Sequence, residues 1–402
     1  MKHPIIINDG LVEEATRWRH HIHAHPETAF EEHGTADFIA QKLESFGLEV
    51  HRGLGGTGVV GTLRKGTSDR AVGLRADMDA LFIHEESDLA YRSTVPGKMH
   101  ACGHDGHSAM LLGAARHLAQ EGDFDGIVRF IFQPAEDTGD EHCGGNAMVK
   151  DGLFERFPVS AIFGLHNFPS MPVGQFATRA GPMLGSIDTF EFHVTSALAH
   201  PGTQFTVADP LLTAARIVQD IHLFKARYVN PSDPVVLSIT QFQSGDPQDR
   251  QSVHVTPSRA VVRGTLYCLD EGVRDSFELG IARIVEHGCE SAGAMHEYRF
   301  ERGYPVLINA ARETAMAATA AAEVVGADQV DSSMKPVMVA EDFAFMLQQV
   351  PGCYIVLGGG GLETSCAGLH NAHYDFNDRI IETGIRYWVT LAQQYLAAEP
   401  AG

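Results

Sequence analysis

The sequence predicts an α/β protein. We expect a mostly parallel central sheet flanked by helices, interrupted by a smaller α+β domain with an antiparallel sheet and two helices. Helical and strand-like runs alternate up to residue 184, which is typical of a parallel sheet covered by helices on both faces. Across 185–298 the strands alternate apolar with polar residues, which indicates one face in water. The first pattern returns over 299–402, so 1–184 and 299–402 are expected to form one domain.

The elements of the first part follow from periodicity and from residues that end helices. Leu11 to His23 is amphipathic and stops before Pro26, which disfavours helix at the preceding residue. Thr35 to Phe46 has apolar residues at helical spacing and ends at Gly47. Ala109 to Leu118 is a third apolar helix. The strands are predicted over 57–63, 71–76, 127–132, 160–165 and 174–178.

The inserted domain has its own signals. Asp188–Thr195 alternates as a half-buried strand, and Asp209-Pro210 is an N-cap followed by proline at the first position of a helix that runs to Phe224. Two more strands are predicted over 235–241 and 253–266, with a helix over 273–287. In the returning part we expect helices over 309–325, 341–349 and 379–396 and a strand over 353–357.

Composition and charge exclude several classes of protein. The chain has 402 residues, with 51 acidic against 30 basic side chains and a formal net charge of -21. Such a surface repels phosphate backbones and anionic lipids, so we expect neither nucleic-acid nor membrane binding. No apolar run is long enough to span a bilayer, and the N-terminus lacks the pattern of a signal peptide. Six scattered cysteines suit free thiols, and the expected location is the cytoplasm.

Four short clusters carry residues suited to chemistry. Met99–His107 contains Cys102 and His104 among glycines, and a thiolate beside imidazoles is what a Zn²⁺-like ion binds. The other clusters are the adjacent acids Glu136-Asp137, then His166-Asn167 and His370-Asn371. Each alone has an ordinary structural explanation, such as a helix cap or a buried hydrogen-bond partner. Ligands of α/β sheets collect where strands end, and the clusters all follow ends of predicted elements.

These clusters, in order along nearly the whole chain, resemble one family. The strings at 75–81, 99–107, 133–137, 165–167, 341–343 and 369–378 are similar to those of metallopeptidase-type amidohydrolases. That family includes hippurate hydrolases, N-acyl-L-amino-acid amidohydrolases and auxin-conjugate hydrolases. The resemblance implies a zinc-exopeptidase-like catalytic domain (1–184 and 299–402) and a lid or dimerisation domain (185–298) that pairs two or more copies. It also implies two divalent ions per subunit, Zn²⁺ or Mn²⁺, with Co²⁺ or Ni²⁺ possible.

The resemblance assigns roles by position. Glu136 would be the general base that takes a proton from a metal-activated water. Asp77 and Asp79 would orient ligands, with Asp79 counted among the catalytic residues, and His200 would bind the oxyanion across the dimer. The metal ligands would be Cys102, which lies between the ions, with His104, Asp137, His166 and His370.

Three positions depart from the family pattern. Asp137 stands where relatives usually have glutamate, and it is shorter by one carbon–carbon bond, about 1.5 Å. Either the backbone at Asp137 must therefore lie closer to the metal ions, or one ion is held more weakly. Phe205 replaces a second histidine of the inserted domain, and His254 replaces an asparagine. His254 is either a donor to the substrate or a surface histidine.

The function that these features favour is hydrolysis of the amide bond of N-acyl or N-aroyl amino acids to a carboxylate and a free amino acid. A peptidase, or a deacetylase or desuccinylase acting on a diaminopimelate intermediate, is the alternative within the family. A metal-independent cysteine hydrolase that uses Cys102 is the alternative of a different class. A non-catalytic metal-binding protein would need a closed four-ligand site, and Glu136 beside Asp137 argues against it.

Overall fold

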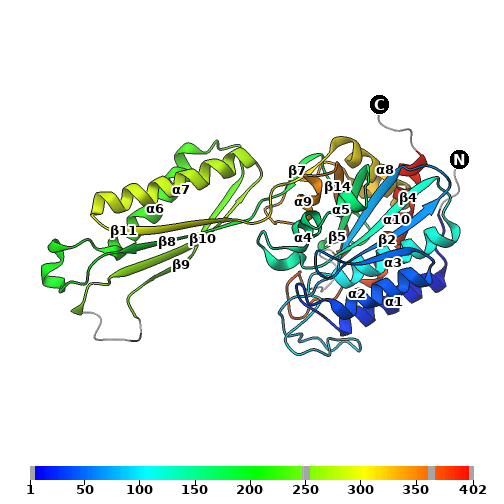
Figure 1. Cartoon of the computed structure of the whole chain (residues 1–402), viewed down its shortest axis with the longest axis horizontal. Coiled ribbons are helices and arrows are strands. Elements are labelled where there is room, and N and C mark those ends of the chain that lie inside the picture. The colour runs from blue at the N-terminus through cyan, green and yellow to red at the C-terminus, as the bar shows by residue number, and fades with distance from the viewer. Residues whose placement is uncertain (1–4, 247, 249–253, 361–366, 398–402) are drawn as a thin grey trace. The chain divides into compact units, whose positions relative to one another are not determined.

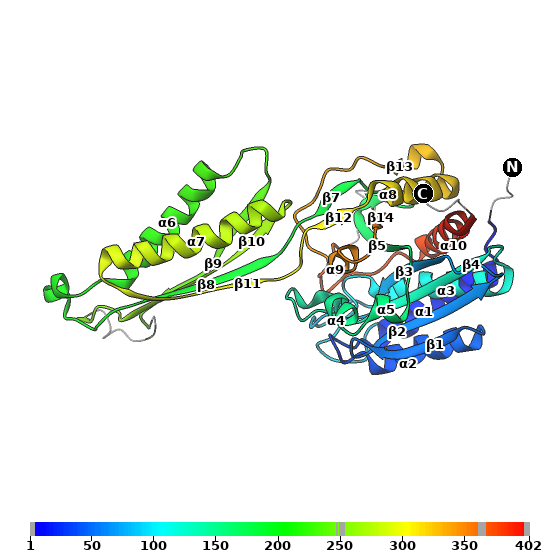
Figure 2. The same cartoon turned by 45° about the horizontal axis from the view of Figure 1, so that its top comes forward.

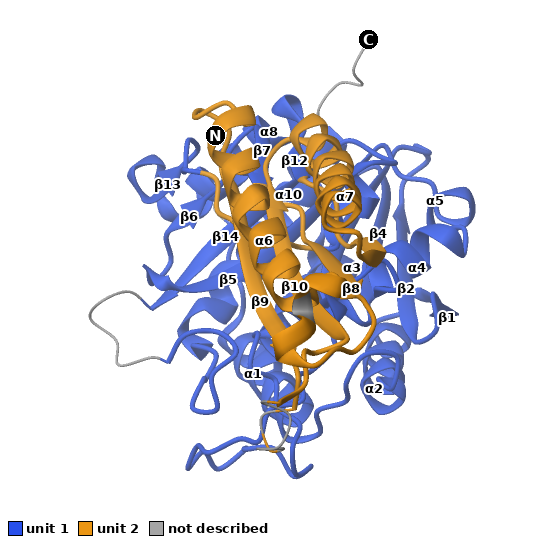
Figure 3. Cartoon of the chain, turned by 90° about the vertical axis from the view of Figure 1, so that its left-hand side faces the viewer, with its two compact units in different colours: residues 1–183, 307–335, 342–402 blue, residues 184–306, 336–341 orange. Residues whose placement is uncertain are grey.

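The computed structural model describes residues 5–246, 248, 254–360 and 367–397, and the chain divides into two compact units (Figure 1, Figure 3). Unit 1 comprises Met1–Met183, Leu307–Lys335 and Asp342–Gly402. Unit 2 comprises Leu184–Val306 and Pro336–Glu341. Val253, where a strand was predicted to begin, and Cys366 lie outside the described residues.

Unit 1 is built on an eight-stranded sheet whose centre is parallel. The order is β1-β2-β4-β3-β5-β14-β6-β13, in which β4, β3, β5 and β14 run parallel and β2 is antiparallel to both of its neighbours, β1 and β4. The predicted mostly parallel sheet is therefore confirmed at the centre. The strands are β1 (Glu49–Leu54), β2 (Gly58–Lys65), β3 (Ala71–Asp77), β4 (Gly126–Gln133), β5 (Ala161–Pro172), β6 (Phe176–Ala177), β13 (Val330–Asp331) and β14 (Gly352–Gly360).

Both faces of the central strands are buried. Val72 and Leu74 of β3 lie in one apolar core with residues of the helices α1, α3 and α10. Figure 2 shows these helices beside the strands of unit 1. On the opposite face, a side chain added at Gly73 would meet Ile131 and Ile162. The helices of unit 1 are α1 (Asp9–Ala24), α2 (His33–Ser45), α3 (His104–Glu121), α4 (Gly144–Lys150), α5 (Leu153–Arg156), α8 (Ala311–Val325), α9 (Phe343–Leu347) and α10 (Ile381–Ala397). The short 3-10 turns are η1 (Glu136–Thr138), η4 (Ala327–Gln329) and η5 (Asp378–Ile380).

Unit 2 is an antiparallel sheet with two long helices, as predicted. Its strand order is β11-β8-β10-β9, and apolar residues of β8 pack with residues of both helices. Asp209 caps the first helix by accepting a hydrogen bond from Leu212 N, which confirms the predicted N-cap. The elements are β8 (Asp188–Thr195), η2 (Pro201–Thr206), α6 (Pro210–Tyr228), β9 (Val235–Ser244), β10 (Arg259–Cys268), α7 (Glu271–Ala292) and β11 (Met295–Arg302).

The domain boundary and the ends of several helices and strands differ from those predicted from the sequence. The boundary expected at residue 298 falls inside β11, which pairs with β8 along its length, so unit 2 continues to Val306. β10 begins at Arg259, because Val255 to Ser258 form a turn and an isolated bridge. α9 spans only Phe343–Leu347. A two-stranded sheet, β7 (Gly181–Leu184) with β12 (Leu307–Asn309), was not predicted.

No helix among the described residues combines the length and the apolar character that a membrane span requires.

Candidate metal centre

The carboxyl ends of the parallel strands place the polar clusters in one region of unit 1. Asp77 ends β3 beside Gln133 at the end of neighbouring β4. His166 lies on β5, the strand on the other side of β3. Gly103 begins α3 with a left-handed backbone, φ 92°, and this turn carries Cys102 and His104 to the same place. The fold thereby gathers donors that are far apart in the sequence.

Each of the five predicted ligands lies within 4 Å of at least one other. Cys102 Sγ is 3.4 Å from His166 Nε2 and 3.4 Å from His370 Nε2. His370 Nε2 is 3.4 Å from Asp137 Oδ1, and Asp137 Oδ2 is 3.9 Å from His104 Nε2. Cys102 with His104 and His166 forms one possible metal-holding group, and Cys102 with Asp137 and His370 forms a second. The thiol is common to both groups.

The donor set fits divalent cations of the zinc type. Thiol, imidazole and carboxylate together are the ligands that Zn²⁺ accepts. His104 Nε2 is buried and has no hydrogen-bond partner among the described residues, a costly state for a polar atom unless an ion or water fills the place. The shorter side chain of Asp137 still comes within 3.9 Å of His104 Nε2 and 3.4 Å of His370 Nε2. The backbone at Asp137 has non-helical angles, φ -80° and ψ 27°.

Neighbouring groups fix how two of the imidazoles face the centre. His104 Nδ1 lies 3.0 Å from both the carbonyl oxygen and Oδ1 of Asp79, so Nδ1–H donates there and Nε2 faces Asp137 Oδ2, 3.9 Å away. His166 Nδ1 donates in the same way to the carbonyl oxygen of Asn167, at 2.7 Å. Asp79 Oδ2 also accepts from the backbone N–H of Asp137, at 3.0 Å. Asp79 therefore orients two of the predicted ligands, which is typical support for a metal site.

Asp77 acts through a buried imidazole that the sequence did not single out. His107 Nδ1 is 2.6 Å from Asp77 Oδ1, and Arg75 Nη1 donates to Asp77 Oδ2 at 2.6 Å. His107 Nε2 accepts from the backbone N–H of Asn167, at 3.0 Å, next to His166. The only sequence signal for His107 was its place three residues after His104 on one helix.

Burial and nearby charge set the protonation of these groups. Burial raises the pKa of the Cys102 thiol well above its usual value and lowers the pKa of His166 well below its own. Burial opposes ionisation of Asp77, yet His104, His107 and Arg75 hold the pKa of that carboxyl well below the ordinary range. Without a cation the thiol is therefore protonated, and binding an ion there releases a proton.

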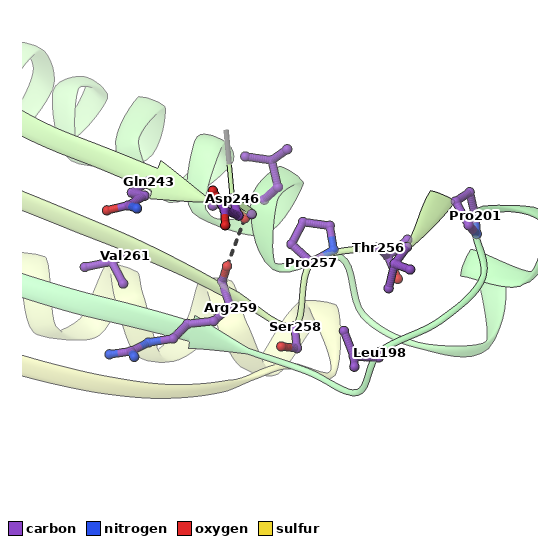
Figure 4. A pocket seen from close by; sticks show the side chains of 13 residues that line it. Leu198, Pro201, Gln243, Asp246, Thr256, Pro257, Ser258, Arg259 and Val261 are labelled. Atoms are coloured by element: carbon purple, nitrogen blue, oxygen red, sulfur yellow. Dashed lines mark hydrogen bonds between the residues drawn. The ribbon is translucent and has the colours of Figure 1, made fainter. Parts of the chain in front are cut away.

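Of the remaining predicted site residues, Glu136 lies in unit 1, with Oε2 3.9 Å from His104 Nε2, and His200 lies in unit 2. His200 is exposed, and its Nδ1 accepts from Gly202 N at 3.0 Å, so Nε2 carries the proton and is available as a donor. Phe205 is 85% exposed, and His254 is exposed too. A pocket of about 850 Å³ lies beside them; Leu198, Pro201, Thr256 and Pro257 are part of its lining (Figure 4).

Comparison with known proteins shows which family this sequence matches. Residues 73–394 match the peptidase family M20/M25/M40. The chain belongs to this family. It is 36% identical over 386 residues to hippurate hydrolase of Campylobacter jejuni, covering 95% of this chain and 97% of the relative. It is 37% identical over 303 residues to the N-acyl-L-amino acid amidohydrolase of Geobacillus stearothermophilus, covering 75% of this chain and 79% of the relative.

A solved M20 structure shares the fold. The YXEP protein of Bacillus subtilis, described as a dinuclear metal binding peptidase from the M20 family, superposes with a TM-score of 0.80 at 29% identity. The match covers 97% of this chain and 99% of that one. The predicted resemblance is confirmed. These matches lend no support to a cysteine hydrolase, and the buried, protonated thiol of Cys102 is a poor nucleophile.

Two further groups near the centre escaped the sequence reasoning. Gln133 Nε2 and Arg75 Nη2 both donate to Asp342 Oδ1, at 2.7 and 3.1 Å, and so join the end of β4 to the start of α9. Glu32 is completely buried and accepts the backbone N–H of Ala135 at 2.9 Å. Its position in the acidic pair Glu31-Glu32 before α2 gave no sign of this, because acids at helix starts normally face water.

Proposed function

We propose that this M20 protein hydrolyses the amide bond of N-acyl or N-aroyl amino acids. The observation that carries the proposal is the pair of overlapping donor groups that share Cys102, with Glu136 beside them. Two divalent ions held by Cys102, His104, Asp137, His166 and His370 would supply a Lewis acid for the amide carbonyl and would lower the pKa of the attacking water. The names and coverage of the relatives support the same reaction.

Glu136 is assigned the proton transfer. Its Oε2 lies 3.9 Å from His104 Nε2, and the side chain is buried at the start of η1, so it adjoins the donors without belonging to either group. We assign Oε2 to take the proton of the attacking water and to return it to the departing nitrogen. Asp79 keeps His104 and the Asp137 backbone in place during the reaction.

Unit 2 is assigned to closing over the substrate and to pairing two copies of the chain. The exposed Nε2–H of His200 is suited to stabilise a developing oxyanion. Light scattering during gel filtration tests the pairing, for which a monomer would be the contrary result. We also propose a cytoplasmic location, which suits the absence of disulfides among the five cysteines that the structure describes.

The deciding experiment measures hydrolysis of N-benzoylglycine before and after removal of metal. Protein stripped by a chelator and dialysed should lose activity, and Mn²⁺, Zn²⁺, Co²⁺ and Ni²⁺ should be compared for restoring it. A panel of N-acetyl, N-benzoyl and indole-acetyl amino acids, a dipeptide, and N-acetyl and N-succinyl diaminopimelate then separates the amidohydrolase from the peptidase and deacylase alternatives. Full activity of metal-free protein would overturn the proposal.

A further inference from the structure

Glu32 joins three separate segments of unit 1 through one buried carboxylate. Oε1 accepts the backbone N–H groups of Phe30, at 3.0 Å, and Ala135, at 2.9 Å. Oε2 accepts the hydroxyl of Thr57 at 2.6 Å. The residue is 0% exposed, and burial raises its pKa to about 7. A charge placed there is costly unless all its hydrogen bonds are made, so this position has a specific use.

The use is apparent at Ala135. This residue has φ 49° and ψ 47°, a left-handed conformation that costs a non-glycine residue about 1–2 kcal/mol. Its N–H is bound by Glu32, and its carbonyl oxygen accepts from Gly144 N at 2.9 Å. The next residue in the chain is Glu136. The direction in which the Glu136 side chain leaves the backbone therefore depends on the strained turn at Ala135. Hydrogen bonds to both the N–H and the carbonyl oxygen of Ala135 hold this turn.

We propose that Glu32 is a positioning residue, which holds the left-handed turn at Ala135 and thereby aims Glu136 for proton transfer. This inference rests on the proposed function of Glu136. It predicts that loss of the hydrogen bonds that the Glu32 side chain accepts lowers turnover while metal and substrate still bind, because Glu32 contacts none of the five predicted metal ligands through its hydrogen bonds. A misplacement of about 1 Å at a reacting group is enough to cost about 10²-fold.

The test compares Glu32→Ala with Glu32→Gln at pH 8, with bound metal measured by elemental analysis. Glu32→Ala should lower kcat on N-benzoylglycine about 10- to 100-fold with KM and metal content near those of the unmodified protein. Glu32→Gln should keep most of kcat, since its amide oxygen still accepts both N–H groups and the Thr57 hydroxyl can rotate to accept from its NH₂ group. If Glu32→Ala is insoluble, Glu32→Asp replaces it, because the shorter acid cannot reach both amides.

Adding Ala135→Gly distinguishes a positioning role of Glu32 from a general effect on stability. Glycine adopts positive φ without strain, so adding Ala135→Gly to Glu32→Ala should restore kcat severalfold. The matched control is Glu27→Ala. Glu27 is also an acid of the α1–α2 loop, but its carboxylate oxygens accept from Gly34 N and Thr35 N at the start of α2. The Glu27→Ala variant should have a lower free energy of unfolding and an unchanged kcat.

Three results would overturn the inference: unchanged kcat in Glu32→Ala, an equal loss in Glu27→Ala, or no restoration by Ala135→Gly. Hydrogen exchange of the Ala135 amide separates this inference from the proposed function. The amide should exchange faster in Glu32→Ala whether or not the unmodified protein cleaves N-benzoylglycine. An inactive unmodified protein counts against the proposed function alone, whereas unchanged exchange at Ala135 counts against the role of Glu32.

Discussion

Glu136 and Asp137 are neighbours in the chain with different assigned roles, and the difference comes from the contacts of each. Asp137 Oδ1 lies 3.4 Å from His370 Nε2, and its backbone N–H is held by Asp79. Glu136 Oε2 lies 3.9 Å from His104 Nε2, and Glu136 belongs to neither of the two groups that contain Cys102, although it also lies close to Glu341 and Asp342. One acid can therefore hold an ion while the other transfers protons.

Glu136→Gln should separate these roles. The amide cannot take up a proton, so kcat on N-benzoylglycine should fall about 10²- to 10⁴-fold, the usual worth of general acid–base catalysis. Metal content, measured by elemental analysis, should stay that of the unmodified protein. Glu31→Gln, which alters an acid on the surface, is the control and should keep full activity. A Glu136→Gln protein with normal turnover would show that proton transfer is assigned to the wrong residue.

Sequence reasoning grouped these side chains because their clusters follow the ends of predicted elements and match the family pattern in order. Each cluster alone has an ordinary structural explanation, but the structure brings all five predicted ligands together. Glu32 and His107 could not be found in this way. Their partners are the backbone N–H of Ala135 and the side chain of Asp77, and such contacts depend on tertiary folding rather than on local pattern.

At the scale of elements, α1 and α3 are joined by buried charge as well as by apolar packing. His23 of α1 lies 2.9 Å from Asp105 of α3, and Arg19 of α1 lies 3.4 Å from the same carboxylate. Burial alone would lower the pKa of His23, but Asp105 and Glu85 raise it to about 9. Since α3 begins at His104, this linkage also anchors the turn that carries two predicted ligands.

His23→Gln should therefore make stability depend on pH in a defined direction. The folded-state pKa of about 9 exceeds the ordinary 6.5, so the stabilisation is full below pH 6.5 and is lost as pH rises through 9. The free energy of unfolding lost in the variant should be larger at pH 6 than at pH 10, by on the order of 3 kcal/mol. Urea titrations followed by fluorescence of Trp18 and Trp388 measure this.

His21→Gln is the matched control on the same helix. Burial and the charge of His25 lower the pKa of His21, so its protonation opposes folding below pH 6.5. Its replacement should raise stability at low pH, the opposite sign to His23→Gln. A His23→Gln variant whose deficit is the same at pH 6 and pH 10 would show that the ion pair with Asp105 contributes no pH dependence.

The elements themselves were predicted unevenly. Buried strands such as β3 and β4 are continuous apolar runs and were found within one or two residues. β11 was missed because most of its side chains are exposed and charged, with only Tyr298 and Phe300 partly buried. Its pairing with β8 is made by backbone groups, which any sequence offers.

At the scale of the whole molecule, the chain leaves unit 1 and returns to it. All five predicted ligands belong to unit 1, and so do both tryptophans of the chain, Trp18 and Trp388. Unit 2 has an apolar core of its own, built from β8, β10, α6 and α7. Metal binding should therefore stabilise one unit and leave the other unchanged.

Calorimetry with and without a chelator tests this separation. An ion present at a hundredfold excess over its Kd adds about 2.7 kcal/mol to the stability of the unit that binds it. Chelation should lower the melting temperature reported by tryptophan fluorescence and one calorimetric transition, and a transition from unit 2 should stay in place. An equal shift of every transition would show that the units unfold together.

The position of His370 has a consequence for how the protein is made. Its backbone N–H donates to the carbonyl oxygen of Ala101, which seats it beside Cys102, although 268 residues separate the two in the chain. A ribosome therefore synthesises all of β8 to β11 after the first four donors and before the fifth. A nascent chain can offer an incoming ion only a partial set of ligands, and the second donor group is incomplete until His370 has been synthesised and has folded back onto Ala101.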